Sequence, residues 1–218
     1  DHRDLHSFPT RRSSDLTIDV LANDTDVDGP ALTIKSASVD PTQGTVSIVS
    51  GQLVFTPATD FTGTATITYV STDGSADSAP TAVTVTVTPI NDAPVAAADT
   101  ATTAEETAVT IDVLANDTDV DGPALTIKSA SVDPTQGTVS IVAGQLVFTP
   151  ATDFTGTATI SYVSTDGSAD SAPTAVTVTV TPINDAPVAV ADTATTAEET
   201  PVTIDVLAND TDVDGPAL

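Results

Sequence analysis

The chain has 218 residues, and its 31 aspartates and glutamates against 5 lysines and arginines give it a formal charge of −26. This charge excludes a nucleic-acid partner, because phosphate binding needs clustered basic side chains, and it excludes attachment to an anionic membrane surface for the same reason. No cysteine is present for a disulfide framework, and no apolar window reaches the roughly 18 residues of a membrane span, so we expect no membrane insertion.

The first sixteen residues do not continue the pattern of the rest of the chain. By the repeat register they should resemble residues 93–109, and they share almost nothing with them. They look like translated sequencing-adapter read-through, a contaminant of assembled genomes; a genuine basic tail is the alternative. We interpret residues 1–16 as a non-native leader and leave its histidines and arginines out of the functional analysis.

From residue 17 onward the sequence repeats itself every 93 residues. Residues 17–125 and 110–218 align without a gap and differ only at the pairs Ser50/Ala143, Thr68/Ser161, Ala97/Val190 and Ala108/Pro201. We therefore predict a first repeat over 17–92 that lacks its opening strand, a complete repeat over 93–185 and a truncated third repeat over 186–218. Copies this similar are recent duplications, so a residue shared by all of them is one observation rather than three.

Apolar residues in the complete repeat recur at every second position, which is the period of a strand with one buried face. The pattern predicts strands near 95–98, 109–113, 125–127, 139–141, 146–148, 158–162 and 176–180. Turn sequences rich in Asp, Gly and Pro separate them. Seven short alternating strands in about 100 residues are typical of a Greek-key sandwich of immunoglobulin type. We therefore predict an all-β chain of tandem seven-stranded Greek-key sandwiches.

An acidic motif, Asn-Asp-Thr-Asp-Val-Asp-Gly, follows the second expected strand of each repeat, at 23–29, 116–122 and 209–215. Carboxylates about 5 Å apart repel by roughly 3 kcal/mol per pair at an effective dielectric of about 20. A hard cation removes this repulsion, and Ca²⁺ collects six to eight oxygen ligands. The alternative is an acidic turn that binds nothing, since Asp, Asn and Gly are the ordinary turn residues. An EF-hand is excluded, because its twelfth position requires Glu and is Lys128 here.

Strand parity predicts which acidic residues meet. Successive strands reverse direction, so the loops after the second, fourth and sixth strands lie at the end of the sandwich that faces the preceding repeat. The loops after the first, third and fifth strands lie at the other end. The first end of the complete repeat then gathers Asp117, Asp119, Asp121 and Asp166 beside the linker residues Asn91 and Asp92. The far end gathers Glu105, Glu106 and Asp153 beside Asn184 and Asp185.

The repeat resembles a known family in several motifs at once. They are Asn-Asp-Ala-Pro-Val-Ala at 91–96, Ala-Glu-Glu-Thr at 104–107, Val-Leu-Ala-Asn-Asp-Thr-Asp at 113–119, Gln-Gly-Thr-Val at 136–139, Phe-Thr-Pro at 148–150 and Thr-Asp-Gly at 165–167. Together they resemble the bacterial cadherin-like or Ig-like tandem repeats of large secreted and surface adhesins. The resemblance covers nearly everything after residue 16, and it implies Ca²⁺ held between successive domains by an Asp-x-Asp loop, an Asn-Asp linker and acids of the preceding domain.

The resemblance turns these acidic positions into candidate calcium ligands at two junctions. At the second junction the candidates are Glu105, Glu106, Asp153, Asn184, Asp185, Asp210, Asp212 and Asp214. At the first junction they are Asp60, Asn91, Asp92, Asp117, Asp119, Asp121 and Asp166, and binding there should be weaker because the leader has replaced the glutamate-bearing strand.

Catalysis is not expected. Nucleophile and base combinations need His or Cys, and neither occurs after residue 16. A glycosidase would need a singled-out buried acid, and no aromatic sugar platform accompanies the carboxylates. We expect Tyr69 and Tyr162 to be core residues rather than ligand contacts.

Two functions remain open. The first is a structural extender of a bacterial adhesin, extracellular or at the cell surface, whose partners are the neighbouring repeats and whose junctions are stiffened by Ca²⁺. The alternative is a carbohydrate- or protein-binding β-sandwich module without junction calcium.

Overall fold

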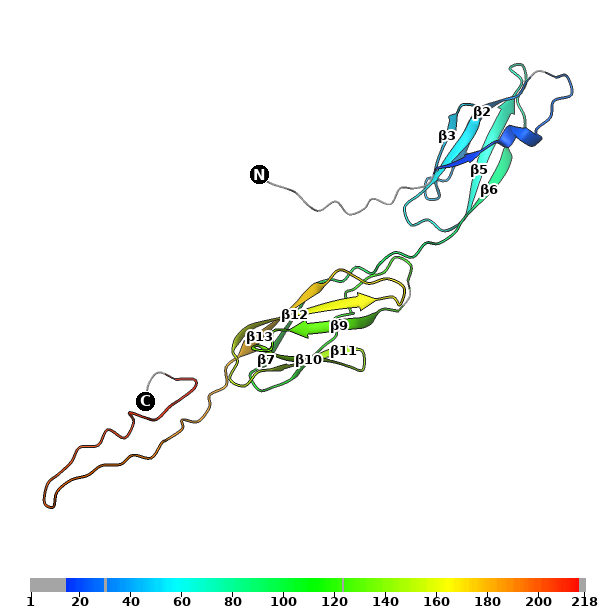
Figure 1. Cartoon of the computed structure of the whole chain (residues 1–218). Helices are drawn as coiled ribbons and strands as arrows, with labels where there is room; N and C mark the ends of the chain where they lie inside the picture. The colour runs from blue at the N-terminus through cyan, green and yellow to red at the C-terminus, as the bar shows by residue number, and fades with distance from the viewer. Residues whose placement is uncertain (1–14, 30, 123, 216–218) are drawn as a thin grey trace, which may run out of the picture. The chain divides into compact units, whose positions relative to one another are not determined.

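The computed structural model describes residues 15–29, 31–122 and 124–215. The chain divides into two compact units, residues 1–90 and 91–218. Figure 1 shows strands as the dominant element of both units, and the all-β prediction is confirmed. The helical content of the described residues is a 3-10 turn, η1 (Val20–Asn23), so no described helix is long and apolar enough to cross a membrane.

The second unit contains the complete sandwich. Its strands are β7 (Asp99–Ala104), β8 (Val109–Ile111), β9 (Thr126–Val132), β10 (Gly137–Val142), β11 (Gln145–Pro150), β12 (Gly156–Thr165) and β13 (Thr174–Thr181). One sheet has the order β7-β13-β12-β9 and the other has the order β10-β11-β8. Fully buried side chains from both sheets, among them Phe148, Ile160 and Tyr162, form one core.

The alternation of residue types explains this core. Val176, Val178 and Val180 point inward along β13 and are buried, whereas the threonines between them are exposed. β-branched residues suit a pleated strand with one buried face. Because each strand reverses the direction of the previous one, the first and seventh strands run parallel, and β13 indeed pairs with β7 in parallel, with Val176 opposite Asp99.

The opening strand begins later than the sequence predicts. The prediction placed it near 95–98, but β7 starts at Asp99. The reason is that Val95 is occupied by an isolated bridge to Thr118 in the acidic loop, so the chain joins the sheet only after this contact.

The first unit repeats the same design. Its strands are β1 (Leu16–Ile18), β2 (Thr33–Val39), β3 (Gly44–Val49), β4 (Gln52–Pro57), β5 (Gly63–Thr72) and β6 (Thr81–Val87), in sheets of order β1-β4-β3 and β2-β5-β6. Leu53, Phe55 and Ile67 are fully buried in its core. By the register of 93 residues, the counterpart of β7 falls on residues 6–11, which lie outside the described residues, as does almost all of the predicted leader.

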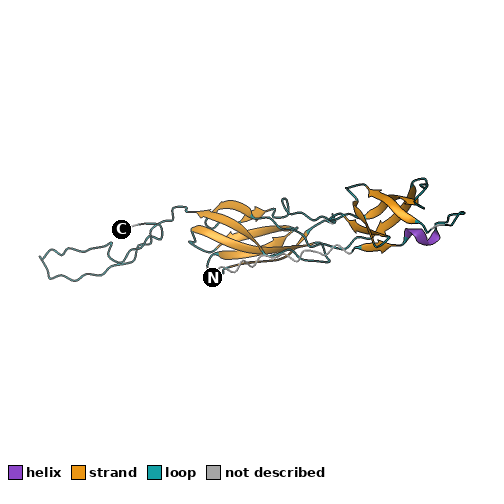
Figure 2. Ribbon diagram, turned by 90° about the horizontal axis from the view of Figure 1, so that it is seen from above, coloured by secondary structure: helices purple, strands orange, loops and turns teal. Residues whose placement is uncertain are grey.

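The third copy does not form the two strands that its sequence predicts. Between residues 182 and 215 its ordered pairing is a single bridge between Val188 and Thr211, and Figure 2 shows this part of the chain as loop. The physical reason is the choice of partners: β7 pairs with β13 and β8 pairs with β11 of the same repeat. The counterparts of β13 and β11 are not among these residues, so the segments that correspond to β7 and β8 have no strand to join.

Gly137 shows how closely the strands of one sandwich approach each other. Its φ is +151°, and a Cβ placed there would lie 2.3 Å from the carbonyl oxygen of Thr149 and 2.8 Å from a ring atom of Phe148. Glycine is therefore required at this position, and Gly44 meets the same contacts in the first unit.

Candidate metal-binding site

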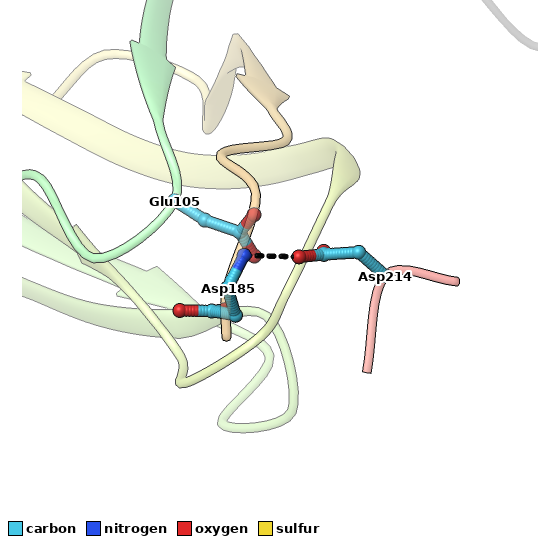
Figure 3. Close-up of side chains that lie close together, drawn as sticks. All are labelled: Glu105, Asp185 and Asp214. Atoms are coloured by element: carbon cyan, nitrogen blue, oxygen red, sulfur yellow. Dashed lines mark hydrogen bonds between the residues drawn. The ribbon is translucent and has the colours of Figure 1, made fainter. Parts of the chain in front are cut away.

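Three carboxylates from different segments of the second unit converge at the end of the sandwich that meets the third copy. They are Glu105 in the turn after β7, Asp185 in the linker after β13, and Asp214 in the acidic loop of the third copy. One oxygen of each lies within 4.8 Å of the others, and Figure 3 shows the three side chains together. Segments 29 to 109 residues apart in sequence thus bring their negative charges to one place.

Glu105 is the buried member of the group, with only 2% of its surface exposed. Its backbone N–H donates to the carbonyl of Thr181 at 2.9 Å, which continues the pairing of β7 with β13 by one residue. Its Oε1 accepts a hydrogen bond of 2.6 Å from the backbone N–H of Ile183. The carboxylate is therefore fixed at the point where the chain leaves the sandwich and enters the linker.

Asp185 and Asp214 are joined through the backbone. The N–H of Asp185 donates to Oδ2 of Asp214, the contact drawn as a dashed line in Figure 3. The N–H of Asp214 in turn donates to Oδ1 of Asp212 at 3.0 Å. Loss of solvation raises the pKa of Asp185, and the charges of Asp214, Asp153, Glu105 and Asp212 raise it further. A carboxyl group that resists ionisation is the expected result of crowding negative charges in this way.

The opposite end of the complete sandwich gathers a second group around the linker residues Asn91 and Asp92. The side-chain amide of Asn91 donates to Oδ2 of Asp166 at 2.8 Å, and the N–H of Asp92 donates to Oδ2 of Asp121 at 2.6 Å. The N–H of Asp121 donates to Oδ1 of Asp119 at 2.8 Å. The other oxygen of Asp119 is buried and has no hydrogen-bond partner among the described residues, so a negative oxygen at this end is left without a donor.

Asp166 is stabilised in its charged form. The backbone N–H groups of Ala169 and Ser168, followed by the amide of Asn91, hold the pKa of Asp166 below its ordinary value. Asp166 therefore stays ionised to a lower pH than an ordinary aspartate, which adds to the negative potential at this end.

Asp117 is placed differently from Asp119 and Asp121. Its Oδ1 accepts hydrogen bonds from the N–H of Ala97 at 2.9 Å and from the hydroxyl of Tyr162 at 2.8 Å. Tyr162 is fully buried, as expected for a core residue. Its hydroxyl contact was not predicted, although a buried tyrosine hydroxyl usually requires a partner. Asp99 was also missed; burial and the charge of Asp117 raise its pKa.

The remaining predicted residues are linker, loop and turn residues. Asn184 donates to the carbonyl of Asp185 at 2.7 Å, and Asp210 accepts from the N–H of Val190 at 2.8 Å. Glu106 and Asp153 are exposed turn residues with φ near +58° and +56°, and only Asp153 acts on the pKa of Asp185. Asp60 occupies the turn of the first unit that corresponds to Asp153.

The donor set suits a hard divalent cation. Carboxylate oxygens that share one Ca²⁺ at 2.3–2.6 Å can be no more than about 5 Å apart. The three oxygens of Glu105, Asp185 and Asp214 meet this limit. The described residues offer no basic side chain to replace a metal, because their two lysines, Lys35 and Lys128, are paired with Asp77 and Asp170.

The fold and this arrangement define a class of protein: tandem β-sandwich repeats joined by short linkers with acidic residues gathered beside them. Residues 3–89 and 91–182 match the model of the bacterial cadherin-like domain, and residues 184–218 match that of the bacterial Ig domain. The chain therefore belongs to the bacterial cadherin-like domain family. Domains of these two kinds are typically non-catalytic structural modules.

Solved structures match the chain at low sequence identity. The EC21-23 fragment of human CDH23 is 17% identical with a TM-score of 0.52, and the match covers 84% of this chain and 68% of that one. Human mucin-like protocadherin EC1-2 is 19% identical with a TM-score of 0.45, over 73% of this chain and 92% of that one. The endo-fucoidan hydrolase MfFcnA4 is 21% identical with a TM-score of 0.32, and the chain, matched over 72% of its length, spans only 24% of that enzyme. No curated protein matches the chain.

Proposed function

We propose that the chain is part of the extender region of a bacterial adhesin, outside the cell or at its surface, and that Ca²⁺ bound at the junctions between repeats makes the linkers stiff. The observation that carries the proposal is the convergence of Glu105, Asp185 and Asp214 on one point. These residues come from a sandwich, the linker that follows it and the next repeat, so a cation bound by all three ties the three segments together.

Each residue has a distinct part in this proposal. Glu105 supplies a carboxylate whose position is fixed by the backbone of Thr181 and Ile183, so the sandwich offers a rigid ligand. Asp185 supplies a carboxylate from the linker, and Asp214 supplies one from the acidic loop of the next repeat. Bound Ca²⁺ would neutralise the mutual repulsion of these groups, which without it favours separation of the loop from the sandwich.

The other end of the complete sandwich supports the same function with a related set of linker and loop residues, although Arg12 stands at the register position of Glu105. Asp119, Asp121 and Asp166 lie beside Asn91 and Asp92. The bonds from Asp92 to Asp121 and from Asp121 to Asp119 recur at the second junction, and the bond from Asn91 to Asp166 adds to them. The N–H of Asp92 binds Asp121 just as the N–H of Asp185 binds Asp214, 93 residues later. We propose that this end also takes Ca²⁺, so that successive linkers of an array are ordered in the same way.

In this proposal the repeats contribute to adhesion by acting as a stiff spacer and not by binding the adhesive target themselves. A row of sandwiches with ordered linkers holds a distal binding domain away from the cell, whereas flexible linkers let it collapse. Extracellular modules bind Ca²⁺ with dissociation constants of about 10⁻⁴ to 10⁻³ M, which suits a protein exposed to a calcium-containing medium.

Thermal unfolding of the 218-residue chain in EDTA, in Mg²⁺ and in Ca²⁺ tests the proposal. A ligand that binds only the folded state raises its stability by mass action, so we expect the melting temperature to rise with millimolar Ca²⁺ and much less with Mg²⁺, which dehydrates reluctantly. Identical melting in EDTA and in Ca²⁺ would refute the proposal.

A further inference from the structure

We infer that the first aspartate of each acidic loop, Asp117 and its counterpart Asp210, is a positioning residue that anchors the loop to the linker through one carboxylate oxygen. The inference rests on the calcium sites of the proposed function. It assigns to this aspartate a role different from that of the two aspartates that follow it, although all three look equivalent in sequence.

The contacts of Asp117 carry the inference. Its Oδ1 accepts from the N–H of Ala97 at 2.9 Å and from the hydroxyl of Tyr162 at 2.8 Å. The same hydroxyl lies 2.9 Å from the carbonyl of Ala97 and 3.2 Å from that of Val113, and Tyr162 has no exposed surface. Oδ1 is thus occupied by two donors, one in the segment after the linker and one in the core, whereas Oδ2 of Asp117 is buried and has no hydrogen-bond partner among the described residues.

Backbone pairing extends the anchor. The N–H of Val95 donates to the carbonyl of Thr118 at 2.8 Å, and the N–H of Thr118 donates back to Val95 at 3.0 Å. Together with the bond from Ala97, these contacts fix the loop alongside residues 95–97. Because the register is fixed at Asp117 and Thr118, the side chain of Asp121 reaches the N–H of Asp92.

The third copy shows the same contacts in a segment that has no packed sandwich around it. The pair Val188 and Thr211 exchanges hydrogen bonds of 2.8 and 3.1 Å, and the N–H of Val190 donates to Oδ1 of Asp210 at 2.8 Å. These bonds are present although residues 191–208 form no strand. The contacts between the linker and the loop are therefore present here without a tyrosine donor, and they again accompany the contact between Asp185 and Asp214.

The first copy preserves the tyrosine contact. The hydroxyl of Tyr69 lies 2.9 and 3.1 Å from the two carboxylate oxygens of Asp24, the counterpart of Asp117. The bond between the sixth strand and the first loop aspartate is thus a property of both packed sandwiches.

Calcium titration of the whole chain by calorimetry tests the inference, with substitutions at Asp210. The third copy has no packed core around Asp210, so replacing it cannot unfold a sandwich. Asp210→Asn keeps an oxygen that can accept from Val190, and its affinity at the second junction should fall by less than about fivefold, the size of a screened charge interaction. Asp210→Ala loses the anchor, and affinity should fall roughly ten- to hundredfold, the usual cost of removing a group that orients a metal ligand. Asp24→Ala, in the first copy, is the control and should leave this junction unchanged.

The outcomes separate the inference from the proposed function. If the unchanged chain binds no Ca²⁺, the proposed function is refuted and the inference falls with it. If the unchanged chain binds and Asp210→Asn loses as much affinity as Asp214→Asn, then Asp210 is a ligand and the inference alone is overturned. Equal affinities for Asp210→Ala and the unchanged chain would overturn it as well. Tyr162→Phe supplies a second measurement, since it should weaken binding at the Asn91–Asp92 end while leaving the second junction unchanged.

Discussion

Replacing Glu105 by Gln should have opposite effects in the presence and in the absence of calcium. Gln keeps an oxygen that can accept the 2.6 Å hydrogen bond from Ile183, so the local geometry of this buried side chain is preserved. Its charge is lost. Without Ca²⁺ the loss of this charge removes repulsion by Asp185 and Asp214, each of which has an oxygen within 4.8 Å of an oxygen of Glu105. The repulsion is roughly 3 kcal/mol per pair as an upper limit, and about 1 kcal/mol after screening of the two more exposed partners.

With Ca²⁺ the expected sign changes, because the proposed site has lost one of its charged ligands. A site with a dissociation constant of about 10⁻⁴ to 10⁻³ M adds about 1.4 to 2.7 kcal/mol of stability at about 10 mM Ca²⁺. We expect Glu105→Gln to lose most of this gain, at about 4–8 °C in Tm for each kcal/mol.

Differential scanning calorimetry in EDTA and in Ca²⁺ measures both effects on the same sample. The matched control is Glu198→Gln, which makes the same change at the equivalent position of the third copy, where Glu198 is exposed. An equal response of the two variants to Ca²⁺, or a lower Tm of Glu105→Gln in EDTA, would contradict a calcium-binding role of Glu105.

Three further predictions concern the linker, the sandwich and an isolated turn. Asp214→Asn should leave the linker amides as mobile in Ca²⁺ as in EDTA when followed by ¹⁵N relaxation, because the cation loses its contact with the third copy; a linker that Ca²⁺ still orders would contradict this. Gly137→Ala should lower stability by about 3 kcal/mol in urea unfolding, because its Cβ would lie 2.3 Å from a carbonyl oxygen. Gly144→Ala, with open space around its Cβ, should cost only about 1 kcal/mol, and equal losses would refute the steric argument. Asp133 should titrate below an ordinary aspartate in a carboxyl NMR titration, because N–H and hydroxyl donors two residues later lower its pKa. Its contribution to stability is therefore present above the unfolded pKa and lost as the pH falls through the lower folded value; an ordinary pKa would contradict this.

Much of the fold could be predicted because it depends on a short-range pattern. Val176, Val178 and Val180 alternate with threonines, and this alone identifies a strand and its inward face. Parity of direction then predicted the gathering of acids at both ends and agrees with the parallel pairing of β7 with β13. The start of the first strand was predicted wrongly because two pairings compete there. Val95 was assigned to a strand, but it pairs with Thr118, because the linker and the acidic loop lie together before the sheet begins.

The candidate site was predicted at the level of loops but not of individual atoms. The three loop aspartates are equivalent in the sequence pattern, yet Asp117 contacts Tyr162 and Ala97 whereas Asp121 contacts the linker. That difference depends on which residue of the loop pairs with Val95, a register that no short-range pattern specifies. The burial of Glu105 could not be predicted from the sequence either. Glu105 and Glu106 are adjacent glutamates, and only the pairing of β7 with β13 decides which of the two side chains turns inward.

The most direct test of the calcium proposal is the anomalous X-ray scattering of a crystal of the chain grown with Ca²⁺, measured at long wavelength. The proposal predicts a calcium peak coordinated jointly by Glu105, Asp185 and Asp214, with oxygens at about 2.3–2.6 Å. A crystal without a peak at this point, or with calcium bound by the loop aspartates alone and not by Glu105, would contradict it.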